Sequence, residues 1–117
     1  MQIAERTIGD VTILDLKGPL VEGEGDDAFR DAVNRLVDLG RMQVLVNMAE
    51  VLYIDSTGLG VLASKYVTLH RRNGRLKLCN ISPRTRRVLE TTKLLKVFDV
   101  FETEADAIDS FNANPRT

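Results

Sequence analysis

The stretch Asp55-Ser56-Thr57-Gly58-Leu59-Gly60 stands between two apolar patterns of different period. Before it, Val44-Leu45-Val46 is a short apolar run rich in β-branched residues, which is typical of a strand covered on both faces. After it, apolar residues recur at helical spacing until Asn73-Gly74: Leu59, Leu62, Ala63, Tyr66 and Leu69. The stretch therefore predicts a turn from a buried strand into a helix.

Two strands and a helix are predicted before this turn. Residues 3–8 and 11–17 read as strands, and Gly9-Asp10 between them predicts a two-residue hairpin in which glycine supplies the positive φ. Gly18-Pro19 ends the second strand, and residues 21–25 read as a loop. A helix then begins at Asp26-Asp27, because acidic side chains suit the positive end of the helix dipole, and Gly40 ends it. Its apolar stripe is Phe29, Ala32, Val33, Leu36 and Leu39.

After the turn, strands and helices alternate. Residues 75–80 read as a strand with Leu76 and Leu78 on one face. Ser82 is a good N-cap for a helix with Pro83 at its first position, and this helix is expected to carry Val88, Leu89 and Leu95. Residues 97–101 read as a short strand. Residues 103–106 resemble a capping box, and the last helical stripe is Ala105, Ile108 and Phe111.

The order of these elements predicts an α/β fold. Strands separated by helices imply βαβ crossovers, so we expect a mixed, mostly parallel sheet of about five strands with about four helices, opening with an N-terminal β-hairpin. The 117 residues suit one domain, expected over residues 1–111. The polar residues 112–117 are expected to form a disordered tail.

Composition excludes several classes of protein. The chain is 44% hydrophobic and 28% charged, as in an average soluble domain, and its single cysteine, Cys79, excludes an internal disulfide framework. No apolar run approaches the roughly 20 residues of a membrane-spanning helix. The first residues lack the pattern of a signal peptide, so we expect a cytoplasmic protein that does not insert into membranes.

Charge is unevenly distributed along the chain. Residues 1–58 hold 5 basic and 11 acidic side chains, whereas residues 59–117 hold 11 and 6. Nine basic residues lie between Arg71 and Lys96 with one acid, Glu90. This stretch indicates either a solvated basic face or a docking surface for an acidic partner, a phosphate or an anionic lipid head. No aromatic side chains interleave with these charges, so direct nucleic-acid binding is not expected.

The turn itself has a structural and a functional interpretation. In the structural one, the hydroxyl of Ser56 or Thr57 caps the helix and the glycines let the chain bend. In the functional one, Gly58 and Gly60 expose the backbone to the close approach of another surface. A helix N-terminus also suits a phosphate, and phosphorylation of Ser56 would add roughly −1.5 to −2 charges.

Catalysis is not expected at this turn. A hydrolase elbow has the pattern G-x-S-x-G, but Ile54 stands two residues before Ser56. The sole histidine, His70, lies about four helical turns away on the same helix and cannot act as the base. Asp10 and Asp15 do not form the adjacent acidic pair of a magnesium-dependent receiver domain. We therefore expect no enzyme activity, no metal site and no cofactor. His70 is expected to be structural or merely exposed, and Cys79 to be a buried small hydrophobic residue.

The motif Asp55–Gly60, preceded by Val44-Leu45-Val46-Asn47, resembles the STAS domain family of bacterial anti-sigma factor antagonists. The likeness covers nearly the whole chain. Gly18 closes the second strand as in the family's Thr-Gly-Glu turn, and residues 76–83 resemble the family's strand leading to Ser-Pro. Thr92-Lys93-Leu94 falls where the family often has Ser/Thr-Gly-Leu.

This resemblance implies a partner-switching mechanism. The unmodified domain would bind an anti-sigma factor with serine kinase activity and so free the sigma factor. That kinase would phosphorylate Ser56, the phosphorylated form would release it, and a serine phosphatase would reverse the modification. The partner-binding residues implied are Asp55, Ser56, Thr57, Gly58, Leu59 and Gly60. The nucleotide and magnesium belong to the kinase, so the resemblance implies no cofactor for this chain.

Two positions depart from the family pattern. Val21 stands where the family often has an acidic residue near the phosphorylated serine, with Glu22 one position later, and Lys93 replaces a common glycine. These departures keep a second interpretation open: a STAS scaffold subunit, never phosphorylated, of a membrane transport or stress-sensing complex. The resemblance leaves open whether Thr57 is a second phosphorylation site, and which oligomeric state the chain adopts.

Overall fold

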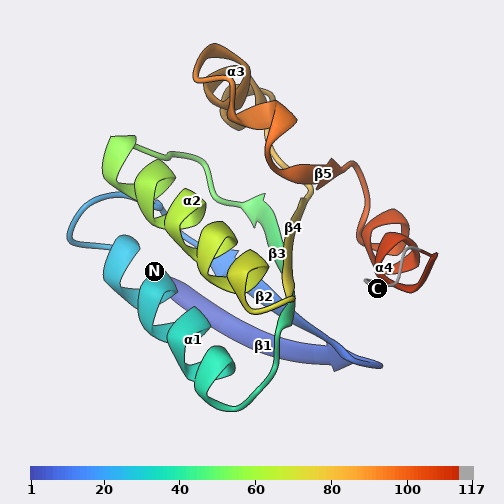
Figure 1. The fold of residues 1–117 in the computed structure, drawn as a ribbon. Helices are drawn as coiled ribbons and strands as arrows, with labels where there is room; N and C mark the ends of the chain where they lie inside the picture. Colours follow the sequence, from blue (N-terminus) through green and yellow to red (C-terminus); the bar gives the residue numbers. More distant parts are fainter. Residues whose placement is uncertain (114–117) are drawn as a thin grey trace.

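The structure, a computed structural model, describes residues 1–113 and has a single five-stranded sheet in the order β1-β2-β3-β4-β5 (Figure 1). The elements are β1 (Gln2–Ile8), β2 (Val11–Lys17), α1 (Asp26–Asp38), β3 (Gln43–Glu50), α2 (Ser56–Arg71), β4 (Arg75–Cys79), α3 (Pro83–Thr91), the 3₁₀ helix η1 (Leu94–Lys96), β5 (Asp99–Phe101) and α4 (Glu104–Ala113). Only β1 and β2 are antiparallel; the other neighbouring strands are parallel. The predicted α/β fold with a mixed, mostly parallel sheet is confirmed.

The N-terminal hairpin forms as predicted. Ile8 pairs with Val11 across the two-residue turn, and Gly9 has a φ of +59°. Glycine adopts this left-handed conformation at no steric cost, so the local sequence is sufficient to fix the turn. β1 therefore lies at one edge of the sheet and leaves β2 to pair with β3.

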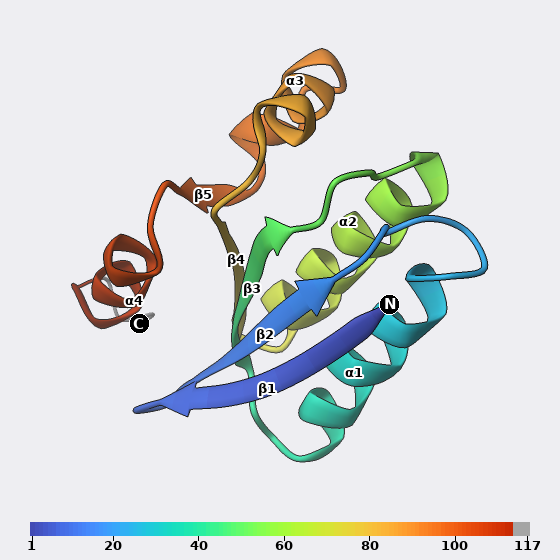
Figure 2. The same cartoon turned by 180° about the vertical axis from the view of Figure 1, so that it is seen from behind.

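Helices cover both faces of the sheet. Figures 1 and 2 show α1 and α2 side by side on one face and α4 on the other. Consecutive strand residues point to opposite faces, so Leu14 and Val46 enter the larger core under α1 and α2. Ile13 and Leu45 enter a smaller cluster under α4. The prediction that the run at Val44 is covered on both faces is confirmed.

Two predicted apolar stripes lie on the buried faces of their helices, but each includes one residue that is exposed. Leu39 is 60% exposed, and Val37 takes the buried place at the end of α1. In α4, Ala105 is exposed and Ala107 is fully buried. A period of 3.6 residues is compatible with more than one stripe in a short helix, and the contact with the sheet selects one of them.

The segment between α3 and β5 also differs from the prediction. Lys93 has a φ of +67°, a left-handed conformation that ends α3, so Leu95 lies in η1 and not in α3. β5 begins at Asp99, two residues later than expected. At the C-terminus, α4 includes Asn112 and Ala113 of the predicted tail, while residues 114–117 lie outside the described residues.

The end of β2 and the end of β3 meet at the carboxyl edge of the sheet. Leu20 bridges to Ile54 in parallel, and the Leu20 N–H donates to the Tyr53 carbonyl at 2.9 Å. The loop after β2 is therefore held against the start of α2. None of the helices within residues 1–113 combines the length and apolarity that a membrane span requires.

Candidate functional site

Asp55 is the N-cap of α2 and also ties the neighbouring loop to it. Its Oδ1 accepts a hydrogen bond from the Gly58 N–H at 2.8 Å, and its Oδ2 accepts one from the Glu22 N–H at 3.0 Å. These two backbone donors, Glu22 first, hold the pKa of Asp55 below its ordinary value. The structural interpretation predicted that the hydroxyl of Ser56 or Thr57 caps this helix. That prediction is wrong, because the cap is the Asp55 carboxylate.

Ser56 is the first residue of α2 and is exposed. Because Asp55 caps the helix, the Ser56 hydroxyl is not needed there, and no hydrogen bond within residues 1–113 engages it. A phosphate at this position would sit at the positive end of the helix dipole. It would also lie beside the Asp55 carboxylate, so the local charge would become strongly negative. Thr57 is half-buried, in contrast to its neighbour.

The two glycines of the motif have different surroundings. A Cβ on Gly58 would clash with the Leu20 carbonyl oxygen, so glycine is required there by a contact inside the chain. The expectation that Gly58 opens the backbone to another surface is therefore wrong. Gly60 is exposed, and a Cβ there would meet no atom within 4 Å. Leu59 is buried in the core, so the outward surface of the motif consists mainly of Asp55, Ser56 and Gly60.

The loop that contains Val21 lies directly beside the motif. The Val21 carbonyl accepts hydrogen bonds from the N–H groups of Glu24, Gly25 and Asp26, which fold the loop into a tight turn. The next residue, Glu22, is exposed and donates its N–H to Asp55. Glu22, the acidic residue one position after Val21, is therefore hydrogen-bonded to the motif through its backbone. No sequence signal points to this bond, because it joins residues 33 positions apart.

The remaining candidates are far from the motif or inert. His70 is exposed near the other end of α2, where its ring stacks on Tyr66 with centroids 5.9 Å apart. Cys79 is buried, and burial raises the pKa of its thiol to about 11. Within residues 1–113, no three His, Cys, Asp or Glu side chains gather as metal ligands would.

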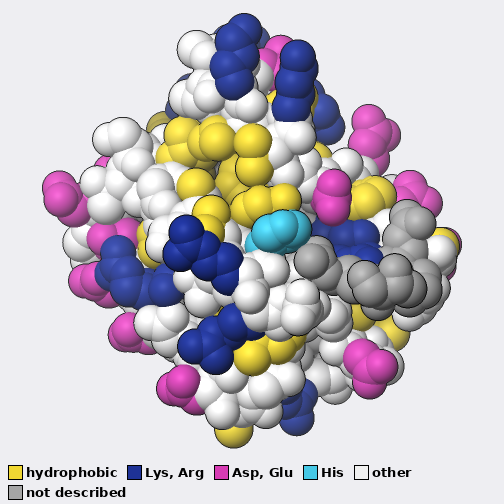
Figure 3. Space-filling model, viewed as in Figure 1, with side chains coloured by type: hydrophobic (Ala, Val, Ile, Leu, Met, Phe, Trp, Pro, Cys, Tyr) yellow, Lys and Arg dark blue, Asp and Glu magenta, His cyan; other side chains and the backbone are white. Residues whose placement is uncertain are grey.

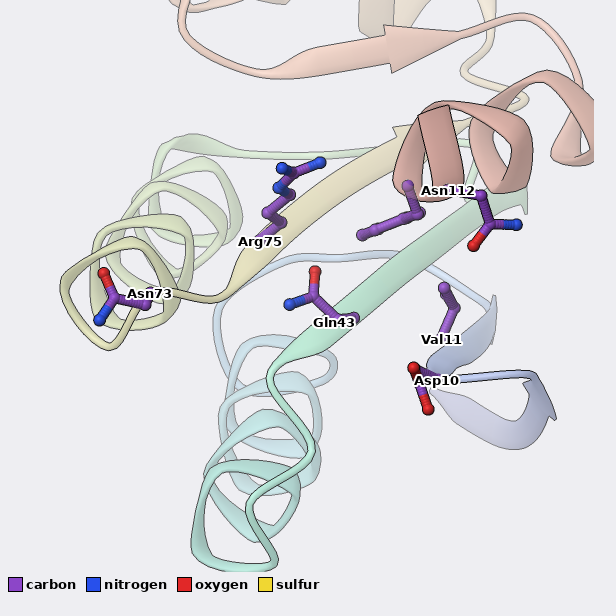
Figure 4. Close-up of a pocket in the computed structure, with 7 residues that line it drawn as sticks. Asp10, Val11, Gln43, Asn73, Arg75 and Asn112 are labelled. Atoms are coloured by element: carbon purple, nitrogen blue, oxygen red, sulfur yellow. The ribbon is translucent and has the colours of Figure 1, made fainter. Parts of the chain in front are cut away.

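The polar hollow drawn in Figure 4 lies at the opposite edge of the sheet. It has a volume of about 260 Å³, and its walls come from the β1–β2 turn, the starts of β3 and β4, and the end of α4. Asp10 and Arg75 contribute charges of opposite sign. The start of α2 is at the other end of the strands, so this hollow is separate from the motif.

The basic stretch between Arg71 and Lys96 does not form one face. Lys77 is 3% exposed and points under α4, while Arg71 ends α2 near the amino edge of the sheet. A separate basic group lies on α3, and Figure 3 shows Lys and Arg side chains over this helix at the top of the molecule. The α3 group lies at the carboxyl edge that also carries Ser56, because Arg84 and Tyr53 line the same hollow there.

Comparisons with known proteins found a matching family model and several relatives. The sequence model of the STAS domain matches residues 2–107. The anti-sigma F factor antagonist of Paenibacillus polymyxa is 26% identical over 93 residues, 75% of this chain and 80% of the relative. The anti-sigma-B factor antagonist of Listeria monocytogenes is 34% identical over 61 residues, 52% of this chain and 54% of the relative.

Solved structures share the fold. An anti-sigma factor antagonist from Mycobacterium paratuberculosis superposes with a TM-score of 0.82 at 23% identity, covering 93% of this chain and 92% of the other. The antagonist SpoIIAA in its unphosphorylated form gives 0.75 at 21% identity, covering 97% and 100%. Because the STAS sequence model extends over nearly all the described residues, the chain belongs to the STAS domain family.

Proposed function

We propose that this chain is an anti-sigma factor antagonist that works by partner switching. Unmodified, it binds an anti-sigma factor that has serine kinase activity. That kinase phosphorylates Ser56, the phosphorylated chain dissociates, and a serine phosphatase restores the binding form. In this proposal the chain acts in the cytoplasm as a binding protein, has no enzyme activity, and needs no cofactor of its own.

The availability of the Ser56 hydroxyl carries the proposal. A kinase substrate must offer a hydroxyl that is exposed and not committed to the fold. Ser56 meets both conditions, because it is exposed and Asp55 supplies the cap of α2. The names of the relatives, which include antagonists of two anti-sigma factors, support the same function.

Charge explains how the phosphate would act. The helix dipole favours an anion at the start of α2 by about 0.3–1 kcal/mol, whereas the Asp55 carboxylate disfavours it. Phosphorylation therefore leaves the helix in place and concentrates negative charge on the surface of the motif. A partner that packs closely over Ser56 would meet this charge without a matching cation and would dissociate.

Substitutions at Ser56 test the switch. The partner is first captured with the Ser56→Ala chain from the native cell, identified, and purified. We expect Ser56→Ala to bind it within about threefold of the wild-type affinity and to gain no phosphate by intact mass. Ser56→Asp should bind at least about tenfold more weakly. Thr57→Ala is the matched control and should still accept one phosphate; wild-type affinity of Ser56→Asp would contradict the switch.

The second candidate function is a STAS scaffold within a larger complex. The murine anion transporter Slc26a9 contains the same fold, with a TM-score of 0.77 over 93% of this chain and only 19% of that chain. Intact mass of the protein isolated from its own cells separates the two functions. A phosphate on Ser56 favours the switch, whereas an unmodified chain that copurifies with a membrane complex favours the scaffold.

A further inference from the structure

Two hollows flank the start of α3 at the carboxyl edge of the sheet. The first, of about 290 Å³, is lined by Leu52, Tyr53, Ser82, Pro83 and Arg84. The second, of about 360 Å³, is lined by Ile81, Pro83, Arg86, Phe101 and Glu102. Pro83 belongs to both, so the first turn of α3 forms a ridge between them. Figures 1 and 2 show α3 beyond the ends of β3 and β4, apart from α1 and α2.

Each hollow combines an aromatic ring with an arginine. In the first, the Arg84 guanidinium carbon lies 5.0 Å from the centroid of the Tyr53 ring. In the second, Phe101 and Arg86 line the same walls. Leu52 and Tyr53 are 66% and 57% exposed, although they are consecutive large apolar residues. Exposed tyrosine and arginine around an apolar floor are typical of the centre of a protein–protein interface.

The charge on the ridge selects an acidic partner. α3 carries Arg84, Arg86 and Arg87 against one acid, Glu90. Within residues 1–113, the ion pairs involve other arginines, so these three keep their charge available. Glu102, at the rim of the second hollow, is the one acidic side chain that lines either of them. A partner surface rich in carboxylates would complement this ridge.

We propose that the two hollows are a second docking contact for the anti-sigma factor. Its occupant is an acidic segment of that partner, which places one apolar side chain in each hollow and its carboxylates over the arginines of α3. The partner's identity rests on the proposed function. Tyr53 lies three residues before Ser56, and its carbonyl is bonded to the loop beside the motif, so one partner can cover both places.

Binding measurements with surface variants test this contact. The probe is the purified anti-sigma factor recovered with the Ser56→Ala chain, titrated calorimetrically with the 117-residue chain. We expect Tyr53→Ala and Arg86→Glu each to weaken binding at least about tenfold. The controls at the opposite edge are Leu39→Ala, another highly exposed apolar residue, and Arg41→Glu, which makes the same charge reversal at an exposed arginine. Both controls should change the affinity less than about twofold.

The Ser56→Asp chain, titrated in parallel, separates this inference from the proposed function. If Ser56→Asp loses binding while Tyr53→Ala and Arg86→Glu bind like the wild type, the docking contact is wrong and the switch stands. If the two surface variants lose binding while Ser56→Asp keeps it, the docking contact stands and the switch is wrong. Added salt should weaken the wild-type complex more than the Arg86→Glu complex, since the contact is electrostatic.

Discussion

At the residue scale, Asp55 caps α2 and Ser56 presents an exposed hydroxyl, two roles that the sequence alone could not assign. Aspartate, serine and threonine are all good N-caps, so the order Asp55-Ser56-Thr57 leaves three candidates for one role. The choice depends on where α2 begins, and α2 begins at Ser56 because Asp55 has an extended backbone and accepts from the Gly58 N–H. The local sequence therefore predicted the turn, but not which side chain caps the helix or that the Ser56 hydroxyl is exposed.

The two glycines of the motif allow a matched pair of substitutions. Gly58→Ala places a methyl group against the Leu20 carbonyl, so we expect it to lower the free energy of unfolding by about 1–3 kcal/mol. Gly60→Ala meets open space on an exposed helix and should raise that free energy by up to about 1 kcal/mol. Urea unfolding of the three proteins, followed by circular dichroism, measures both changes.

Gly58→Ala and Gly60→Ala both add one methyl group to a glycine in the first turns of α2, so each variant is the control for the other. A similar loss of stability at both positions would contradict the difference in their surroundings. If Gly58→Ala proved neutral, the close approach of the Leu20 backbone to the start of α2 would be wrong.

At the scale of elements, α4 is held to the sheet through a buried lysine. The Lys77 Nζ donates a hydrogen bond to the Ser110 hydroxyl at 2.8 Å. The same atom lies 4.6 Å from the centroid of the Phe111 ring. The Phe101 ring is a second neighbour, at 5.5 Å. The removal of this ammonium group from water lowers the pKa of Lys77, although Asp99 partly opposes the effect.

The lowered pKa of Lys77 predicts a pH dependence of stability. Below that pKa the folded protein bears the full cost of burying the charge, and the cost falls as pH rises toward the ordinary lysine range. The wild type should therefore gain stability relative to Lys77→Met as the pH rises toward about 10, near the ordinary pKa of lysine. Urea unfolding at several pH values measures the difference. The exposed Lys96→Met serves as the control; an equally flat profile for both lysines would contradict the burial of Lys77.

The elements that the sequence predicted best are those with a local cause. Gly9 fixes the hairpin and Ser82 caps α3, where its hydroxyl accepts from the Thr85 N–H at 3.0 Å. The errors at Leu39 and Ala105 concern burial, which depends on how each helix packs against the sheet. Lys77 also escaped prediction, because a lysine between leucines indicates an outward face unless the helix that covers it is known.

At the scale of the whole molecule, the direction of the strands separates two surfaces. The parallel strands end at the edge that carries Ser56, the loop around Glu22 and the ridge of α3, which is where open α/β sheets usually bind their ligands. The hollow of Figure 4 lies at the edge where β3 and β4 begin. A charge added to Ser56 is therefore close to the proposed partner surfaces and remote from α4.

This separation predicts that phosphorylation changes the surface and not the fold. We expect Ser56→Asp to alter the free energy of unfolding by less than about 0.5 kcal/mol, because the residue is exposed and the cap stays with Asp55. In ¹H–¹⁵N NMR spectra, shifts should concentrate in residues 54–60 and 20–24, which share the hydrogen bonds of Asp55. Ser56→Ala is the matched control, since it changes the same position without adding a charge. Shifts that reach Phe111 on the far face would instead mean that charge at Ser56 rearranges the sheet and acts through the whole fold.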